Sequence, residues 1–370
     1  METPRAQTGS NVTIAVVRKS DLRTGTIYEQ WSDPTDLARM TPEKVAVILS
    51  NPMSRNEDEP VQLIGLARDQ VAGRVDLLAG DVIMEGETHP VRWASGLAVA
   101  PEMRRTLIGL KLLREMQFSD AVAAAFGPSQ MAHPIYKGFK WTDFVMPRYI
   151  LLRRSRSVIE RKLSVRAARV AAGPVDAFLA LYTRLALRNV GRAVDVRTDT
   201  NVPPELEAAI RCSANTFMPR SVQTLNWRLK SSFHPHPRDR NLLLTIAERG
   251  GVVGYALLKI RFYPLASHRG FRNVLLGSLQ EWLIFDAQRL HYRTLTALAC
   301  RELLRHDVDA IEVCASSERE EQILRHMGMR RVGDVHLMWR PAPGTRLTSP
   351  QCQMQSRWLI RHGDGDGYFF

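Results

Sequence analysis

Cysteine is scarce in this sequence, and its four cysteines lie far apart, with no C-x-x-C pair and no Cys/His spacing of a zinc site. We therefore expect reduced, buried thiols in a cytoplasmic protein and no metal. No uncharged apolar run reaches the roughly 18 residues that a membrane-spanning helix needs. The first residues also lack the pattern of a signal peptide. These absences argue against a zinc module, a disulfide scaffold and a transmembrane protein.

Several common catalytic motifs are missing as well. The sequence has no G-x-S-x-G elbow, no P-loop lysine motif and no H-E-x-x-H pair. Acidic residues are outnumbered, 38 against 51 lysines and arginines, which gives a net charge of +13 and favours an anionic ligand. The length of 370 residues is enough for two or three domains, each with its own core.

The most informative stretch is 97–113, LAVAPEMRRTLIGLKLL. It predicts the end of a strand, a break at Pro101 and then an amphipathic helix. A helix that starts directly after a strand presents free backbone N–H groups and a positive dipole end to an anion. Arg104 and Arg105 stand at this helix start and Gly109 in its first turns, an arrangement suited to a diphosphate.

This pattern, V-x-P-x-x-R-x-x-x-x-G before an apolar helix, resembles the acyl-CoA-binding loop of the GNAT acyltransferases. The family's usual form, R/Q-x-x-G-x-G or -A, aligns here as Arg104-x-x-Leu107-x-Gly109, so a leucine replaces the first glycine. The resemblance implies acetyl-CoA or another acyl-CoA as co-substrate. The donor contacts it implies are Leu97, Ala98, Val99, Arg104, Arg105, Thr106, Leu107, Ile108, Gly109 and Leu110.

A second segment, IYKGFKW at 135–141, is similar to the family's other signature, a helix that ends Tyr-x-x-x-Gly-Phe. The family tyrosine protonates the departing thiolate, and here Tyr136 is the candidate although it stands closer to its glycine. The alternative for Tyr136 is a packed aromatic. His133 is the other candidate for proton transfer.

The resemblance also implies how the acceptor is bound and attacked. A backbone N–H of the fourth strand, at Leu97 to Val99, would stabilise the carbonyl oxygen. Candidate residues for binding a small-molecule acceptor are Trp93, Ser95, Glu281 and Trp282. The implied reaction is direct attack by an amine, for example that of an amino sugar, with no covalent enzyme intermediate.

The second half of the chain repeats the order of elements of the first. A hairpin around Arg249-Gly250-Gly251, a strand at 273–285, a helix at 293–307, a strand at 309–315 and a helix at 318–333 follow one another. This copy lacks the R-x-x-G-x-G loop. We therefore expect an α/β protein with mixed sheets, built as a bacterial tandem GNAT protein whose second domain is degenerate. The expected divisions are 1–154, a linker 155–200, 201–345 and a tail 346–370.

Two further segments have competing interpretations. Residues 151–173 predict a basic helix that ends at Gly173-Pro174; we favour an interdomain helix with a solvated basic face over a contact with an anionic membrane or polymer. GDGDG at 363–367 is expected to be a flexible tail. Rival functions are transfer from an acyl-carrier protein or a tRNA, and a non-catalytic scaffold or polyanion-binding protein.

Overall fold

The chain forms two compact units in the computed structural model. Unit 1 comprises the residues up to Asp143 and those from Leu337, and unit 2 comprises Phe144–His336 and the segment that follows Ser356. The structure describes residues 12–33, 36–84, 87–104, 106–117, 120–160, 164–188, 194–212, 219–233, 235–264, 273–344 and 360–365.

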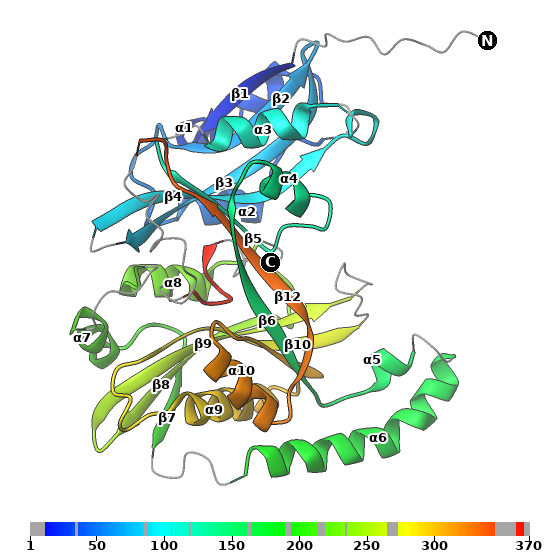
Figure 1. Cartoon of the computed structure of the whole chain (residues 1–370), viewed down its shortest axis with the longest axis vertical. Helices are drawn as coiled ribbons and strands as arrows, with labels where there is room; N and C mark the ends of the chain where they lie inside the picture. Colours follow the sequence, from blue (N-terminus) through cyan, green and yellow to red (C-terminus); the bar gives the residue numbers. More distant parts are fainter. Residues whose placement is uncertain are drawn as a thin grey trace. The chain divides into compact units, whose positions relative to one another are not determined.

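The order of elements is the same in the two halves of the chain, as the sequence predicts (Figure 1). The first half contains β1 (Val12–Arg18), α1 (Lys19–Thr24), α2 (Pro42–Leu49), β2 (Pro60–Ala67), β3 (Gln70–Met84), β4 (Glu87–Val99), α3 (Ile108–Gln117), β5 (Val122–Phe126), α4 (His133–Gly138) and β6 (Thr142–Leu152). The helices α5 (Arg156–Ile159) and α6 (Val165–Ala186) follow. The second half contains β7 (Asp195–Asp199), α7 (Pro204–Cys212), α8 (Val222–Lys230), β8 (Arg240–Glu248), β9 (Gly251–Tyr263), β10 (Val274–Ile284), α9 (Tyr292–Arg305), β11 (Ala310–Cys314), α10 (Glu318–His326) and β12 (Arg330–Arg340).

The strands that make up most of unit 1 lie in the order β1-β2-β3-β4-β5-β12, and those that make up most of unit 2 in the order β6-β11-β10-β9-β8-β7. The pairs β4·β5 and β10·β11 are parallel, and their neighbours are antiparallel. The last strand of each half of the sequence pairs with a strand from the other half. Leu337–Arg340 of β12 pairs with β5, and Arg148–Leu152 of β6 pairs with β11.

One predicted helix is shorter than expected. The helix assigned to 318–333 ends at His326, and β12 begins at Arg330. Gly328, with φ +78°, turns the chain between them, and a left-handed glycine is a common end of a helix.

Helix α3 lies close against the sheet of unit 1, which fixes the start of this helix. Its buried side chains, among them Ile108 and Leu112, pack with Leu63, Val75 and Ala94 in one core cluster. A Cβ atom on Gly73 would lie 2.8 Å from Ile108 Cγ2, so the absence of a side chain there allows the close approach.

The basic linker differs from the prediction. Gly173-Pro174 does not end a helix, because both residues lie inside α6, which runs on to Ala186. A proline inside a helix removes one backbone hydrogen bond and lowers the stability of the helix by about 3 kcal/mol. The helix α6 nevertheless continues through Pro174 for a total of 22 residues. None of the described helices is long and apolar enough to cross a membrane.

The two described free thiols, Cys300 and Cys314, are buried, as the cysteine pattern predicts. Burial raises the pKa of Cys300 to about 12, so its reactive thiolate is scarce at neutral pH. We expect Cys300 to resist alkylation by iodoacetamide at pH 8 until the chain is unfolded with denaturant. Peptide mass spectrometry after timed labelling measures this, and rapid labelling of Cys300 in the native protein would contradict it.

Candidate functional site

Strand β4 leaves its parallel partner β5 in the middle of unit 1. The two strands pair from Val91↔Val122 to Ala94↔Ala125 and no further. Just beyond, β4 is irregular against β3, since Arg74 pairs with Ala98 but Asp76 with Ser95. Gly96 adopts φ +88° in this bulge, a conformation that glycine takes without strain. Along the rest of β4, Leu97 to Val99, the described chain supplies no second strand partner.

The loop between β4 and α3 contains the predicted diphosphate contacts. Thr106 donates from its backbone N–H and its hydroxyl to the Met103 carbonyl, at 2.9 and 2.6 Å. Arg104 is exposed, and Arg105 lies outside the described residues. Leu107 is 63% exposed, so its side chain extends to solvent instead of filling the loop. A Cβ on Gly109 would touch only Val99, at 3.5 Å.

A buried polar row crosses the other face of the sheet directly beneath this bulge. Lys44 Nζ of α2 donates to Asp76 Oδ2 at 2.6 Å and to the Ser95 carbonyl at 3.1 Å. Gln62 donates to Asp76 Oδ1 at 2.8 Å, and Tyr28 donates to Gln62. Burial and the Asp76 charge raise the pKa of Tyr28 to about 12. Lys44 therefore holds β4 in its bulged path.

The sequence does not predict this row of buried polar residues. Its signals are modest: Asp76 is the single acid in the apolar segment VDLLAG, and Lys44 shares a helix face with Val47 and Ile48. Such a charge among inward-facing positions needs a buried partner, but sequence alone does not say which residue supplies it.

The predicted acceptor residues of β4 lie on the same face as Asp76. Ser95 pairs with Asp76, and Trp93 with Leu78, so all four side chains share a face. Trp93 and Ser95 are each 1% exposed. Neither the Trp93 indole nitrogen nor the Ser95 hydroxyl has a hydrogen-bond partner among the described residues. The structure thus brings these two predicted residues to the bulge itself.

The two candidates for proton transfer lie on α4 and differ in their surroundings. Tyr136 is buried in the core cluster of α3, with its ring 4.6 Å from that of Trp141. His133 is part-buried, and its Nε2 lies 2.8 Å from Asp143 Oδ2. Lys137 Nζ lies 3.4 Å from the same carboxylate. A carboxylate that holds an imidazole in one orientation is a common arrangement for proton transfer.

Unit 2 has the same irregularity in the equivalent strand, but there the gap is filled by the C-terminal segment. β10 pairs with β11 as far as Leu279↔Val313 and bulges at Gln280. Gly363 N–H donates to the Gln280 carbonyl at 2.7 Å. Arg361 reaches the Trp282 carbonyl on β10 and Ser316 after β11, at 3.4 and 2.8 Å. Residues 360–365 are buried, so the expectation of a flexible tail at 363–367 is wrong for residues 363–365.

Glu281, a predicted acceptor residue, is fully buried within an ionic network. Its carboxylate accepts hydrogen bonds from Arg228 and from the Tyr255 hydroxyl, and Arg220 lies 3.3 Å away. Arg220 also donates to Asp364 of the C-terminal segment at 3.0 Å. Burial opposes ionisation of Glu281, but the two guanidinium groups outweigh it and lower the carboxyl pKa. The network thus anchors the segment that fills the gap.

The neighbouring predicted residue, Trp282, packs between Tyr292 and Arg361. Its ring centroid lies 4.8 Å from that of Tyr292 and 3.5 Å from the Arg361 guanidinium carbon. A cation over an aromatic face adds about 0.5–2 kcal/mol to such a contact. The two predicted acceptor residues of the second half, Glu281 and Trp282, therefore lie where the C-terminal segment docks.

The loop before α9 is closed by its own residues. Asp286 Oδ1 accepts the N–H groups of Gln288 and Arg289, at 2.9 and 3.3 Å. Leu290 is buried and would meet a Cβ on Gly254 at 2.6 Å. Asp286 and Leu290 thus hold the loop before α9 in place.

No protein-family model and no curated protein sequence matches this chain. Among solved structures it is similar to the N-myristoyltransferase of Saccharomyces cerevisiae with bound myristoyl-CoA, at 9% identity and a TM-score of 0.56, over 93% of this chain and 86% of that one. It is also similar to a GCN5-related N-acetyltransferase from Anabaena variabilis, at 10% identity and a TM-score of 0.52, over 90% and 73% of the two chains.

A third similar structure is a protein of Enterococcus faecalis described as a probable N-acyltransferase, at 12% identity and a TM-score of 0.53, over 90% of this chain and 72% of that one. At these identities the likeness concerns the fold. Together with the repeated order of elements, it shows that this chain has the GNAT fold in two successive copies.

Proposed function

We propose that unit 1 binds acyl-CoA and transfers its acyl group to an amine. The observation that carries this proposal is the divergence of β4 from β5 at the Gly96 bulge, beside the start of α3. In unit 2 the equivalent divergence contains the chain's own Gly363. Myristoyl-CoA bound to a structural relative supports acyl-CoA as the donor.

The donor site follows from the two elements that flank the divergence. The edge of β4 at Leu97 to Val99 would pair with the pantetheine arm, whose amides need backbone partners. The N–H groups of α3 from Ile108 to Leu110, with Arg104, would hold the diphosphate. Because the Leu107 side chain is exposed, it would not fill the space in which the diphosphate approaches the start of α3.

The reaction itself requires little from the protein. The amine nitrogen attacks the thioester carbonyl carbon, the C–S bond breaks, and the amine proton passes to a base while the thiolate takes up a proton. We assign the base to His133, oriented by Asp143. A backbone N–H of β4 would stabilise the oxyanion. The acceptor would approach near Trp93 and Ser95.

The test is consumption of acetyl-CoA in the presence of amine acceptors, among them amino sugars. We expect CoA thiol release together with an acylated amine detected by mass spectrometry. Binding of acetyl-CoA without turnover on any amine would favour a non-catalytic scaffold.

Replacing His133 by alanine is expected to lower kcat about 100-fold, because a general base contributes at least that much, and to leave the affinity for acetyl-CoA unchanged. Lys137→Ala is the matched control, because Lys137 contacts the same Asp143 carboxylate. Equal kcat in the two variants would remove His133 from the mechanism.

A further inference from the structure

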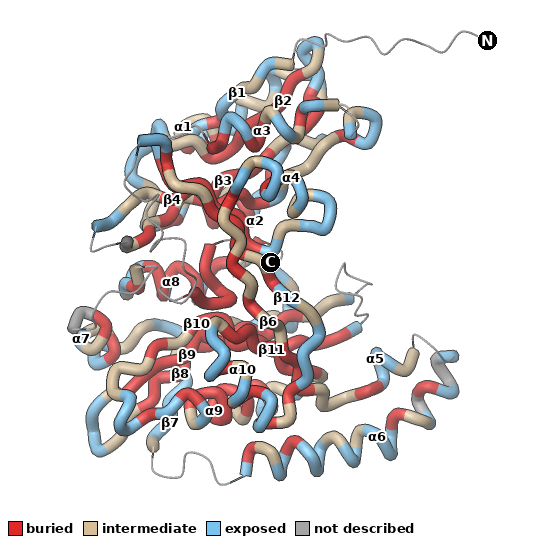
Figure 2. The backbone as a smooth tube through the Cα atoms, in the orientation of Figure 1, coloured by how far each residue is buried: buried red, intermediate tan, exposed pale blue. Residues whose placement is uncertain are grey.

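Helix α6 has an apolar face that is directed to solvent. Val170, Phe178, Leu181 and Leu185 recur at helical spacing and are 79%, 66%, 56% and 55% exposed. The opposite side of α6 faces the rest of unit 2 and is formed by other residues, of which Ala168, Ala172, Thr183 and Leu187 are buried. Exposed residues recur along the whole helix in Figure 2. We call the exposed set, Val170, Val175, Phe178, Leu181 and Leu185, the α6 stripe.

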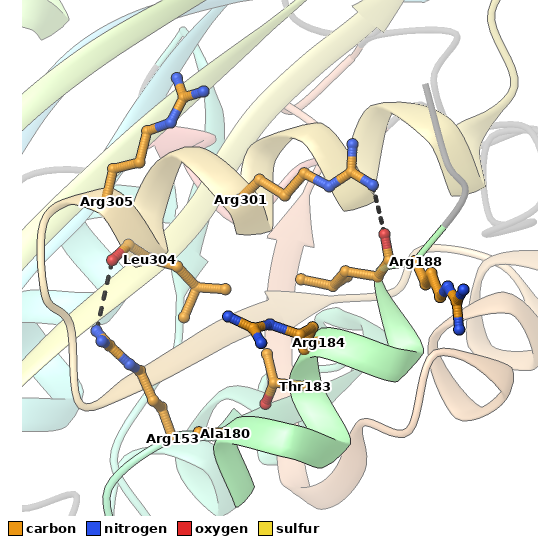
Figure 3. A pocket seen from close by; sticks show the side chains of 9 residues that line it. Arg153, Ala180, Thr183, Arg184, Arg188, Arg301, Leu304 and Arg305 are labelled. Carbon is orange, nitrogen blue, oxygen red and sulfur yellow. Dashed lines mark hydrogen bonds between the residues drawn. The ribbon is translucent and has the colours of Figure 1, made fainter. Parts of the chain in front are cut away.

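A basic pocket adjoins this stripe. It lies between the C-terminal parts of α6 and α9 and has a volume of about 690 Å³. Figure 3 shows the Arg184 side chain extending from α6 into the space between the two helices, with Leu304 above it. The lining includes five arginines, namely Arg153, Arg184, Arg188, Arg301 and Arg305.

The positive charge of the pocket is only partly compensated. Arg153 pairs with Asp307 at 3.0 Å, and Arg305 with Glu302 at 2.7 Å. The guanidinium groups of Arg184 and Arg188 have neither an ion pair nor a hydrogen bond to another described residue. The carbonyl ends of the two helices add about half a negative charge each, which is less than the combined charge of Arg184 and Arg188.

We propose that the α6 stripe and the arginine pocket form a docking surface for an anionic phospholipid membrane. In such a contact the stripe enters the boundary between headgroups and acyl chains, and Arg184 and Arg188 contact lipid phosphates. A helix with one apolar face and a basic flank suits this position. Each arginine near an anionic surface contributes about 1 kcal/mol.

Charge distinguishes a membrane from a second copy of the chain. A symmetric dimer through α6 would bring two arginine pockets of the same sign together, in a chain that already carries +13. An anionic lipid surface instead complements both the stripe and the arginines. The sequence predicts a solvated basic face for residues 151–173 only, and the exposed Phe178 and Leu181 lie beyond that segment.

The test is cosedimentation of the full chain with vesicles of phosphatidylcholine alone and of phosphatidylcholine mixed with phosphatidylglycerol. We expect binding to the mixed vesicles only, weakened by salt. The double variants Phe178→Glu/Leu181→Glu and Arg184→Glu/Arg188→Glu should each bind more than about tenfold more weakly. Arg249→Glu, at the exposed β8–β9 turn, is the matched control and should bind as the native chain does.

Three results would overturn the proposal. Equal binding of the stripe variant and the native chain is the first. The second is displacement from vesicles by millimolar glycerol phosphate, which would make the pocket a site for soluble phosphate compounds. The third is a dimer in light scattering that Phe178→Glu/Leu181→Glu dissociates while neither protein binds vesicles.

Discussion

Gly109→Glu is expected to abolish acyl-CoA binding in unit 1, with a loss of affinity of more than about 1,000-fold. The substitution places a carboxylate in the first turn of α3, where we propose that the diphosphate binds. Two like charges about 4 Å apart near a protein surface repel by about 4 kcal/mol, which corresponds to this factor. Calorimetric titration with acetyl-CoA measures the loss.

The fold should survive this substitution. A Cβ at position 109 meets only Val99, at an ordinary contact distance of 3.5 Å. Glutamate also favours helix more than glycine does, and an acid in the first turn stabilises the helix dipole. Gly109→Ala is the matched control, and we expect it to bind acetyl-CoA within a few fold of the native chain. Unchanged affinity in Gly109→Glu would remove the diphosphate from this loop.

Asp76→Asn should destabilise unit 1 by about 3–5 kcal/mol, because it leaves the Lys44 ammonium buried without its counter-charge. Both side chains are more than nine-tenths buried, at 9% and 0% exposure. Since Lys44 also holds the Ser95 carbonyl, the β4 bulge should loosen and acetyl-CoA affinity should fall as well. Denaturation followed by tryptophan fluorescence gives the first effect, and titration gives the second.

The double variant Lys44→Met/Asp76→Leu removes both charges but keeps side chains of similar size, so it separates the effect of the buried charges on stability from the effect of packing. Replacement of a buried ion pair by apolar residues of similar size is often nearly neutral. We therefore expect this variant to regain most of the stability that Asp76→Asn loses, but not the acetyl-CoA affinity, because methionine cannot donate to Ser95. A double variant less stable than Asp76→Asn would show that the pair does not act through its charge.

The elements that form the proposed donor site could be predicted from the sequence, because the residue patterns that indicate them are local. The apolar strand before Pro101 and the amphipathic helix after it fix β4 and α3 within a few residues. The Arg249-Gly250-Gly251 turn likewise predicts the β8–β9 hairpin. The repeated order of these local signals then indicates the two copies of the fold.

The remaining features depend on contacts between distant residues. Lys44 and Asp76 are 32 positions apart, and Arg220 and Asp364 are 144 apart. The pairing of Leu337 with Phe126 is a similar case, because the strand β12 pairs with the strand β5, which lies far earlier in the sequence. Periodicity describes which face of an element is apolar, but it does not identify the partner that covers it.

The most direct test of the account is calorimetric titration of the whole chain with acetyl-CoA. We predict micromolar binding at one site per chain, because β4 has no second strand partner at Leu97 to Val99 among the described residues, while Gly363 takes the equivalent place in unit 2. Absence of binding at millimolar acetyl-CoA would contradict the donor site in unit 1. Two sites per chain would contradict the conclusion that the C-terminal segment closes unit 2.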